Sequence, residues 1–324
     1  MHLLIIKMTS LGDVVHMLPA LTEAADRLPG LRADWVVEEG YAAIPGWHPA
    51  VQQVIPSAIR RWRRRLGQRP TWQEIAAFRS AVQAHDYDLV LDAQGLLKSA
   101  LVSRLAKGPH AGLDSGSARE RLASLAYGRR YPAPRELHAI TRNRLLTAQA
   151  LGYEMGEEAN LHYGLAPPPP YPVAGLADAY VVCLHGTARP EKEYPEADWA
   201  RLLGRIAALG LGLALPWGNE REKARAERLA AATPQALVLP RLNLAELGGV
   251  IAGARGVIGV DTGLMHLAAA FRKPGVGLYP ATPPALFGVR GEADAPAQIN
   301  LSRPDELAPE VAAEVFARQL PASI

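Results

Sequence analysis

Short runs of apolar residues alternate along the chain with longer segments in which apolar residues recur every three or four positions. In the first half these runs lie at residues 3–7, 34–39 and 88–95. The segment after the third run, LLKSALVSRLAKG, has the apolar spacing of a helix. Strands that are apolar at every position are typical of parallel sheets covered on both faces. The pattern therefore predicts an α/β protein with doubly wound parallel sheets.

The alternation restarts in the second half. Strand-like runs lie at 179–186, 211–218 and 256–261, and helical patterns at 195–210 and 220–232. The helix at 220–232 is rich in charged residues, so we expect it to be exposed. In doubly wound sheets, ligands bind beyond the carboxyl ends of the strands, at the point where the strand order reverses. Candidate chemistry is therefore sought in the loops that follow strands.

A proline-rich segment, APPPPYP at residues 166–172, separates the two halves. Consecutive prolines keep a chain extended and prevent a helix. A length of 324 residues also suits two domains. We expect two Rossmann-like domains facing a cleft, at residues 1–165 and 173–324, with this segment as the linker. The last helix, at 305–320, either trails the second domain or packs back on the first.

Composition excludes several classes of protein. Hydrophobic residues make up 49% and charged residues 21%, which is ordinary for a globular protein, and the net charge of +3 gives no global signal for a polyanion. The single cysteine, Cys183, excludes an internal disulfide and suits a reducing compartment. The nine histidines show no zinc-ligand spacing. No signal peptide or membrane span is recognised, so we expect a cytoplasmic protein that binds no metal.

Arginines are concentrated at residues 59–65, where IRRWRRR places five of them among seven residues. Such a stretch can be a solubilising patch, but the mutual repulsion of its guanidiniums favours an anionic partner. Phosphates and carboxylates of a substrate would fit, and so would nucleic acid. A basic nucleic-acid-binding module therefore remains an alternative function. The small net charge and an aromatic content of only 6% count against it.

The loop after the first strand contains Ser10, Gly12 and Asp13. Asp13 is either a helix N-cap, which spacing alone favours, or a general base at the carboxyl end of a strand. The loop has no G-x-G-x-x-G fingerprint, and the chain has no G-x-x-x-x-G-K-[ST] loop. These absences argue against a dinucleotide oxidoreductase and a P-loop NTPase.

Two loops of the second half could hold a phosphate. Thr187 and Lys192 follow the first strand there, and Asp261, Thr262 and Gly263 join a later strand to a helix. Each group also has an ordinary structural explanation, as a solvated loop or a helix cap. Because both loops follow strands of one domain, we expect them to converge. The lysine and the free N–H groups of the helix would then hold a diphosphate between them.

Two further residues are weaker candidates. Glu222, near the start of the charged helix, could bind ribose hydroxyls, but without context a solvated charge is favoured. His266 lies on an apolar helix face, where a core histidine is favoured over a ligand.

Taken together, these segments resemble the lipopolysaccharide heptosyltransferase I family. The resemblance rests on KMTSLGDVVHMLPAL, IRRWRR, DLVLDAQGLLKSALVSRLA, LPWG with a following Glu, and GVDTGLMHL, in order from residue 1 to about 290. The related heptosyltransferase II family shares mainly the loop aspartate and the DTG..H element. Heptosyltransferase II, which has the same fold, is therefore the nearest alternative.

The resemblance implies an inverting GT-B glycosyltransferase that uses no metal or other cofactor. It would transfer L-glycero-D-manno-heptose from ADP-heptose to the first Kdo of Kdo–lipid A, in peripheral contact with the cytoplasmic face of the inner membrane. No nucleic-acid partner is implied. Asp13 matches the general base of the family. The positions that match its donor site are Thr187, Ala188, Lys192, Glu222, Leu242, Asp261, Thr262, Gly263 and His266. The positions that match its acceptor site are Arg60, Arg61, Arg63, Arg64 and Arg119.

The chain departs from the family at two of these positions. Where relatives often have a second threonine in the donor loop, this chain has Ala188, which removes a hydroxyl that could contact phosphate. Where relatives have a methionine, this chain has Leu242. A change between Met and Leu conserves side-chain volume and should be tolerated beside an adenine.

Overall fold

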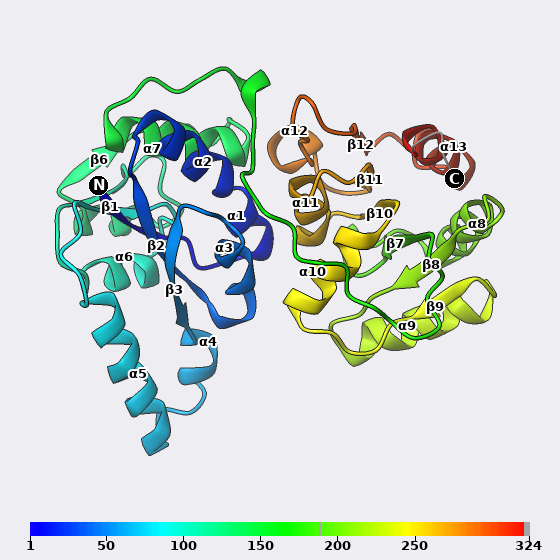
Figure 1. The fold of residues 1–324 in the computed structure, drawn as a ribbon, viewed down its shortest axis with the longest axis horizontal. Helices are drawn as coiled ribbons and strands as arrows, with labels where there is room; N and C mark the ends of the chain where they lie inside the picture. The colour runs from blue at the N-terminus through cyan, green and yellow to red at the C-terminus, as the bar shows by residue number, and fades with distance from the viewer. Residues whose placement is uncertain (188, 321–324) are drawn as a thin grey trace. The chain divides into compact units, whose positions relative to one another are not determined.

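A computed structural model describes residues 1–187 and 189–320 of the chain (Figure 1). The chain divides into two compact units, Met1–Ala166 and Pro167–Ile324. Each unit contains a six-stranded sheet in which every strand pairing is parallel. No helix in these described ranges combines the length and the apolar character that a membrane span needs.

The first unit has the strand order β3-β2-β1-β4-β5-β6. Its strands are β1 (His2–Ile6), β2 (Arg32–Glu38), β3 (Val51–Ser57), β4 (Leu89–Asp92), β5 (His110–Leu113) and β6 (Arg129–Tyr131). This is the strand order of a Rossmann fold, which reverses between β1 and β4. The central strands are buried, in agreement with their uninterrupted apolar runs.

Helices cover both faces of this sheet. They are α1 (Leu11–Val15), α2 (Leu18–Arg27), α3 (Ala43–Gly46), α4 (Ile59–Trp62), α5 (Arg69–Val82), α6 (Leu97–Ser103) and α7 (Ala139–Leu151). Helix α2 packs against α7, while α5 packs against β3 and α6 against β4. A core of apolar side chains under α5 includes Trp62, Phe78 and Val90.

The second unit repeats the same order, as β12-β11-β10-β7-β8-β9. Its strands are β7 (Tyr180–Leu184), β8 (Gly212–Leu215), β9 (Ala236–Val238), β10 (Gly256–Val260), β11 (Gly275–Leu278) and β12 (Gln298–Leu301). Counted from β7, this order also reverses between the first and fourth strands. The prediction of two doubly wound parallel sheets is therefore confirmed.

The helices of the second unit are α8 (Glu196–Ala207), α9 (Glu220–Ala231), α10 (Leu244–Gly253), α11 (Gly263–Ala270), α12 (Pro284–Phe287) and α13 (Pro309–Gln319). The C-terminal helix α13 packs against α8 and β11 of its own unit. Its Ala312 and Phe316 belong to that unit's apolar core. The structure therefore places this helix in the core of the second unit.

The proline-rich segment lies against α10 of the second unit. A Cβ atom at Gly249 would stand 2.7 Å from both the Pro169 carbonyl oxygen and the Tyr171 Cβ, so only glycine allows this approach. The Tyr171 hydroxyl donates to Glu246 Oε1 at 3.4 Å, on the same helix. The segment predicted as a linker therefore packs on a helix, in addition to having the extended conformation that its prolines impose.

Candidate active site

The loops after β7 and β10 meet at the switch point of the second sheet. The Lys192 ammonium, on a short 3-10 helix (η4, Pro190–Lys192), lies 2.6 Å from Asp261 Oδ2. The Thr187 hydroxyl donates to the Asp261 carbonyl oxygen at 3.0 Å. The expected convergence of these loops is therefore present in the structure. The pair is partly accessible, with 24% of the lysine side chain and 11% of the aspartate exposed.

Helix α11 begins at this point. Thr262 is its N-cap, with an extended backbone, and Gly263 is its first residue. The first N–H groups of a helix have no acceptor within the helix, and the helix dipole adds partial positive charge there. Asp261, Thr262 and Gly263 are half-buried. The switch point thus combines a lysine, a hydroxyl and a helix N-terminus, which together suit an anionic ligand.

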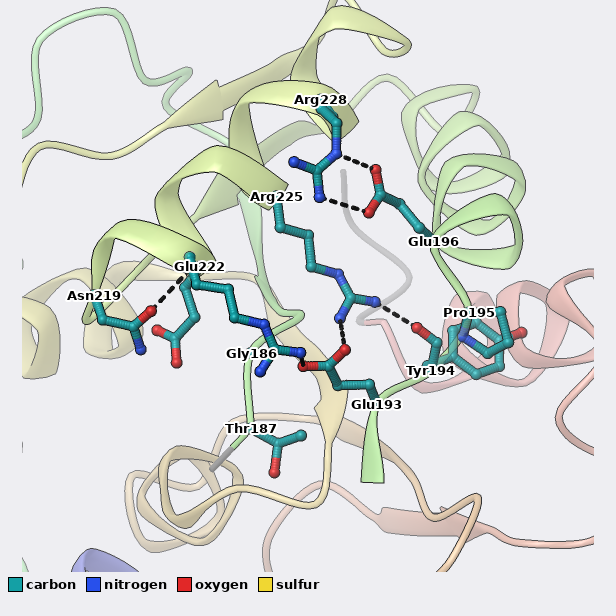
Figure 2. A pocket seen from close by; sticks show the side chains of 11 residues that line it. Gly186, Thr187, Glu193, Tyr194, Pro195, Glu196, Asn219, Glu222, Arg225 and Arg228 are labelled. Atoms are coloured by element: carbon teal, nitrogen blue, oxygen red, sulfur yellow. Dashed lines mark hydrogen bonds and ion pairs between the residues drawn. The ribbon is translucent and has the colours of Figure 1, made fainter. Parts of the chain in front are cut away.

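Glu222 lies beside the same loop. It is in the first turn of α9, and its Oε2 accepts the Gly218 N–H at 2.7 Å. A Cβ atom at Gly186 would be 2.9 Å from Glu222 Cδ, so the absence of a side chain at Gly186 allows this approach. Glu222 and Thr187 line one pocket of about 310 Å³ (Figure 2). Glu222 is therefore part of a concave site, rather than the solvated charge that sequence alone favoured.

Ion pairs from α9 hold the segment that follows Lys192. Arg225 lies between this helix and the segment, with Nη1 3.1 Å from Glu193 Oε2 and Nη2 donating to the Tyr194 carbonyl oxygen (Figure 2). Arg228 Nε donates to Glu196 Oε1 at 2.7 Å. Arg225 is only 7% exposed, so the expectation of an exposed helix at 220–232 is wrong at this position. Its burial lowers the pKa of the guanidinium, while the neighbouring Glu193 opposes that shift.

The remaining donor-site candidates lie in the same unit. Leu242 is half-buried in the connection between β9 and α10. His266 is 3% exposed on α11, three residues after Gly263. Its burial agrees with the core position that sequence alone favoured. Ala188 lies outside the described residues.

Asp13 occupies the corresponding loop of the first unit. Ser10, and not Asp13, is the N-cap of α1; Asp13 is the third helical residue and reaches back to it. Asp13 Oδ2 accepts the Ser10 N–H at 2.6 Å and the Ser10 hydroxyl at 3.1 Å. The N-cap interpretation is therefore wrong in detail. This capping box orients a half-buried carboxylate at the carboxyl end of β1.

Lys7, at the end of β1, is buried below this loop. Its ammonium donates to the Ala93 carbonyl oxygen at 2.7 Å and to Asn143 Oδ1 at 3.2 Å. Burial lowers the pKa of Lys7, and the nearby negative charge of Asp13 opposes that shift. Lys7 thus brings positive charge near Asp13 without a direct hydrogen bond to it among the described contacts.

Two residues after β4 also support this loop, and sequence reasoning did not select them. Gln94 Oε1 accepts the N–H groups of Met8 at 2.9 Å and Thr9 at 3.0 Å. The Lys98 ammonium donates to the Thr9 hydroxyl at 3.3 Å. Both follow β4, the partner of β1 at the switch point. The topology rule that selected loops in the second half would have found them here.

The arginine stretch is divided between internal and exposed positions. Arg61 pairs with Glu39 and Glu74, each at 2.9 Å, and these hydrogen bonds raise its pKa. Trp62 is buried, and its Nε1 donates to Glu74 Oε2 at 2.7 Å. Arg61 is thus partly neutralised by the chain itself. The exposed members of the stretch are Arg60, Arg63, Arg64 and Arg65.

Other basic side chains gather at the same edge of the first sheet. Burial lowers the pKa of Lys98, and the positive charges of Arg60 and Arg63 lower it further. Arg119 is exposed in the loop after β5. Its neighbour Glu120 ties that loop to the carboxyl end of β4, because its N–H donates to the Gly95 carbonyl oxygen at 3.1 Å. Of the acceptor candidates, Arg60 and Arg63 therefore lie near Lys98, which contacts the loop that carries Asp13.

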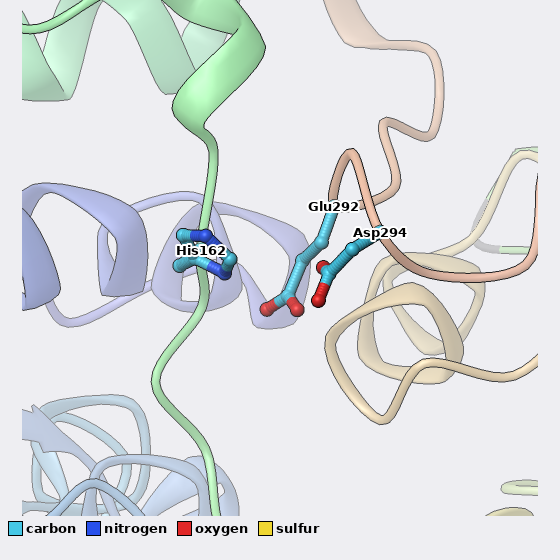
Figure 3. A group of neighbouring side chains, drawn as sticks. All are labelled: His162, Glu292 and Asp294. Carbon is cyan, nitrogen blue, oxygen red and sulfur yellow. The ribbon is translucent and has the colours of Figure 1, made fainter.

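An acidic pair lies elsewhere in the second unit. Glu292 and Asp294 are close together on the segment between α12 and β12 (Figure 3). Arg272 Nη1 donates to Glu292 Oε2 at 2.7 Å and to Asp294 Oδ1 at 3.1 Å. The guanidinium supplies the positive charge that this pair of carboxylates needs.

Comparison with known proteins yields one consistent family. The sequence matches the family described as glycosyltransferase family 9 (heptosyltransferase) over residues 75–313. Lipopolysaccharide heptosyltransferase 1 of Salmonella typhimurium is 48% identical over 293 residues, which cover 90% of this chain and 92% of the relative. The protein of the same name from Pseudomonas aeruginosa is 50% identical over 297 residues, 90% of this chain and 82% of that one.

Solved structures agree with these sequence matches. Escherichia coli heptosyltransferase WaaC with ADP superimposes with a TM-score of 0.87 at 44% identity, covering 98% of both chains. The same enzyme with ADP-2-deoxy-2-fluoro heptose gives a TM-score of 0.84 at 41% identity, covering 98% of this chain and 99% of that one. Escherichia coli heptosyltransferase II, at 18% identity and a TM-score of 0.74, shares the fold.

Proposed function

We propose a specific reaction for this chain, which belongs to glycosyltransferase family 9 and within it to the lipopolysaccharide heptosyltransferase 1 group. The chain transfers L-glycero-D-manno-heptose from ADP-heptose to the first Kdo of Kdo–lipid A. Heptose transfer in lipopolysaccharide core biosynthesis is the activity of that group. The observation that carries the proposal for the donor is the meeting of Lys192, Thr187 and the start of α11 at one switch point.

The second unit would bind the donor. Lys192 and the first N–H groups of α11 match the charge of a diphosphate, and Glu222 lies where it can accept hydrogen bonds from ribose hydroxyls. Lys192 is paired with Asp261. We infer that the diphosphate competes with Asp261 for the lysine. The structures of WaaC with ADP and with an ADP-heptose analogue support this assignment of the donor.

The first unit would supply the base. The acceptor hydroxyl attacks the anomeric carbon of heptose from the face opposite the leaving group, so the new bond forms with inversion as the bond to the diphosphate oxygen breaks. The hydroxyl proton passes to the Asp13 carboxylate, which Ser10 holds in place. ADP leaves with the additional negative charge on its terminal phosphate. Lys192 and the helix N–H groups stabilise that charge as it develops.

We infer that this chemistry proceeds without a metal ion. The need for a cation at the leaving group can be met by the Lys192 ammonium and the positive end of α11, both at the same switch point. Transfer in the presence of a chelator would support this part of the proposal, and loss of transfer that magnesium restores would overturn it.

The exposed arginines would bind the acceptor. Arg60, Arg63, Arg64 and Arg119 are exposed, and Arg60 and Arg63 lie near Lys98, which contacts the Asp13 loop. An inner-core acceptor carries carboxylates and phosphates that guanidiniums bind well. Because this acceptor is a lipid, we place the reaction at the cytoplasmic face of the inner membrane.

The decisive experiment combines the purified chain, ADP-heptose and Kdo–lipid A, with and without EDTA. We expect release of ADP and a glycolipid heavier by one heptose. A parallel reaction with an acceptor that already carries the first heptose tests the heptosyltransferase II alternative. Preference for that acceptor, or no product with either, would overturn the proposed substrate.

A further inference from the structure

Four leucines on two short helices of the first unit expose much of their side chains. Leu97 and Leu101 on α6 are 45% and 71% exposed, and Leu122 and Leu125 on a 3-10 helix (η2, Arg121–Ala126) are 65% and 68% exposed. Residues four apart on an α-helix share a face, as do residues three apart on a 3-10 helix. We name these four side chains the leucine patch. Exposed apolar side chains that form a contiguous patch mark interaction sites, whereas apolar residues scattered singly on a surface are ordinary.

The two helices lie side by side, so their outward faces form one surface. Ala100 of α6 packs with Ala123 and Tyr127 in a small buried cluster beneath both helices. The Leu97 N–H donates to Glu120 Oε2 at 2.5 Å, which ties the start of α6 to the start of η2. With the alanines facing inward, the leucines face outward.

The chain segment that carries the patch is rich in positive charge. Residues 97–131 contain seven lysines and arginines and only two acidic residues, a larger positive excess than the +3 of the whole chain. One of the two, Glu120, is already bonded to the Leu97 N–H. The exposed arginines of this segment are Arg104, Arg119, Arg121, Arg129 and Arg130. The surface is therefore both apolar and cationic.

We propose that the leucine patch and its arginines dock the first unit on an anionic lipid bilayer. Leucines can enter the boundary between headgroups and acyl chains while arginines bind headgroup phosphates. The exposed leucines and the positive excess together fit a bilayer surface, which is uniformly negative at its headgroups and apolar beneath them. The proposal deepens the proposed function, whose acceptor is a lipid, by naming the surface that meets the membrane.

Vesicle binding tests the proposal without measuring transfer. Full-length protein is sedimented with phosphatidylcholine vesicles that contain or lack phosphatidylglycerol, and neither set contains lipid A. We expect binding only to the anionic vesicles, and weaker binding at high salt. Leu101→Ser/Leu125→Ser should lower the vesicle affinity by about tenfold or more, because both side chains lose their apolar contact with the bilayer.

The matched control is Leu209→Ser/Val311→Ser, which removes two exposed apolar side chains of the second unit. It should bind vesicles as the wild type does, and circular dichroism should show both double variants folded. Equal binding by the leucine-patch variant and the wild type would overturn the proposal. So would wild-type binding that appears only when Kdo–lipid A is added, or a wild-type dimer that the leucine-patch variant loses without any vesicle binding.

Failure of the proposed function would give a different result. If the chain binds anionic vesicles through the patch but transfers no heptose to Kdo–lipid A, the docking proposal is supported and the substrate assignment is contradicted. If it transfers heptose to a deacylated, water-soluble acceptor but ignores vesicles, the reverse holds.

Discussion

The two switch points of the molecule have the same strand order but use their lysine and aspartate differently. In the first unit Lys7 is buried at the end of β1 and donates hydrogen bonds to Ala93 and Asn143. Asp13 instead accepts a hydrogen bond from Ser10 in its capping box. In the second unit Lys192 is in the loop, partly exposed, and paired directly with Asp261. The first arrangement leaves a carboxylate able to take a proton, and the second leaves a cation able to meet an anion.

The comparison extends to the strand that follows each reversal. Asp92 ends β4 and is fully buried; its Oδ2 accepts the Tyr127 hydroxyl at 2.7 Å and its Oδ1 accepts the Gln94 N–H at 2.8 Å. Asp261 comes directly after β10 and faces Lys192. The topology brings an aspartate to both places. Burial and partners give the first a structural role and leave the second accessible to a ligand.

The largest effect is expected at the carboxylate of the first switch point. Asp13→Asn should lower kcat by about 100-fold or more, because a general base is lost, while ADP affinity stays within about twofold. Turnover assays and calorimetric titration with ADP measure the two quantities. Asp26→Asn, on the exposed side of α2, is the control. Near-normal turnover of Asp13→Asn would leave Asp13 with only its capping role.

The cation of the second switch point should come next. Lys192→Met should lower kcat/KM for ADP-heptose by about 100-fold, because the ammonium that stabilises the leaving phosphate is gone. Its effect on the KM for acceptor should be small. Arg303→Met, which removes an exposed cation of the second unit, is the control. A larger rise in acceptor KM than in donor KM would contradict the comparison.

Substitution of Arg225 tests whether its contacts with the segment after Lys192 position that lysine. Arg225→Ala should raise the donor KM by about tenfold with a smaller change in kcat, because Glu193 and Tyr194 lose their anchor. Arg225→Lys should recover part of this loss, since it keeps the charge but cannot bind both groups in the same geometry. Arg318→Ala, at an exposed position of α13, controls for the loss of an arginine. Equal loss of folding and activity in both Arg225 variants would indicate a purely structural role.

Removal of exposed positive charge beside Asp13 should have a smaller effect. Arg60→Gln/Arg63→Gln should raise the acceptor KM by about three- to tenfold and weaken its dependence on salt. Donor KM should not change. Arg61→Gln is an informative partner, because Glu39 and Glu74 already engage that guanidinium. A greater effect on the acceptor from Arg61 than from the pair would reverse our ranking of these arginines.

The smallest effect at neutral pH concerns one buried histidine in each unit. Burial lowers the pKa of His48 to about 4 and that of His185 to about 4. Their unfolded values lie near 6.5, so the unfolded chain binds more protons between these values. The contribution of each neutral histidine to the free energy of unfolding is therefore fully present above pH 6.5. It is lost as the pH drops towards 4, by up to about 3 kcal/mol for each histidine. Urea unfolding from pH 7.5 to 4 measures the slope, which His48→Gln should reduce; an unchanged slope would contradict it.

Strand and helix periodicity was sufficient to predict both doubly wound sheets, because a strand covered on both faces must be apolar at every position. The same reasoning selected Thr187, Lys192 and Asp261, since parallel strands of one sheet bring their carboxyl ends to a common edge. It missed Gln94 and Lys98, which lie at the equivalent edge of the first sheet.

Other features were decided only by the tertiary structure. Sequence could not show that Arg225 is buried within a charged helix or that Arg61 is paired internally. Arg61 and Arg225 depend on partners 22 and 31 residues away in the chain, which become neighbours only when the units fold. The sequence by itself determined the periodicity and the residue types at strand ends. Burial and ion pairing depend on distances between side chains, which local pattern does not contain.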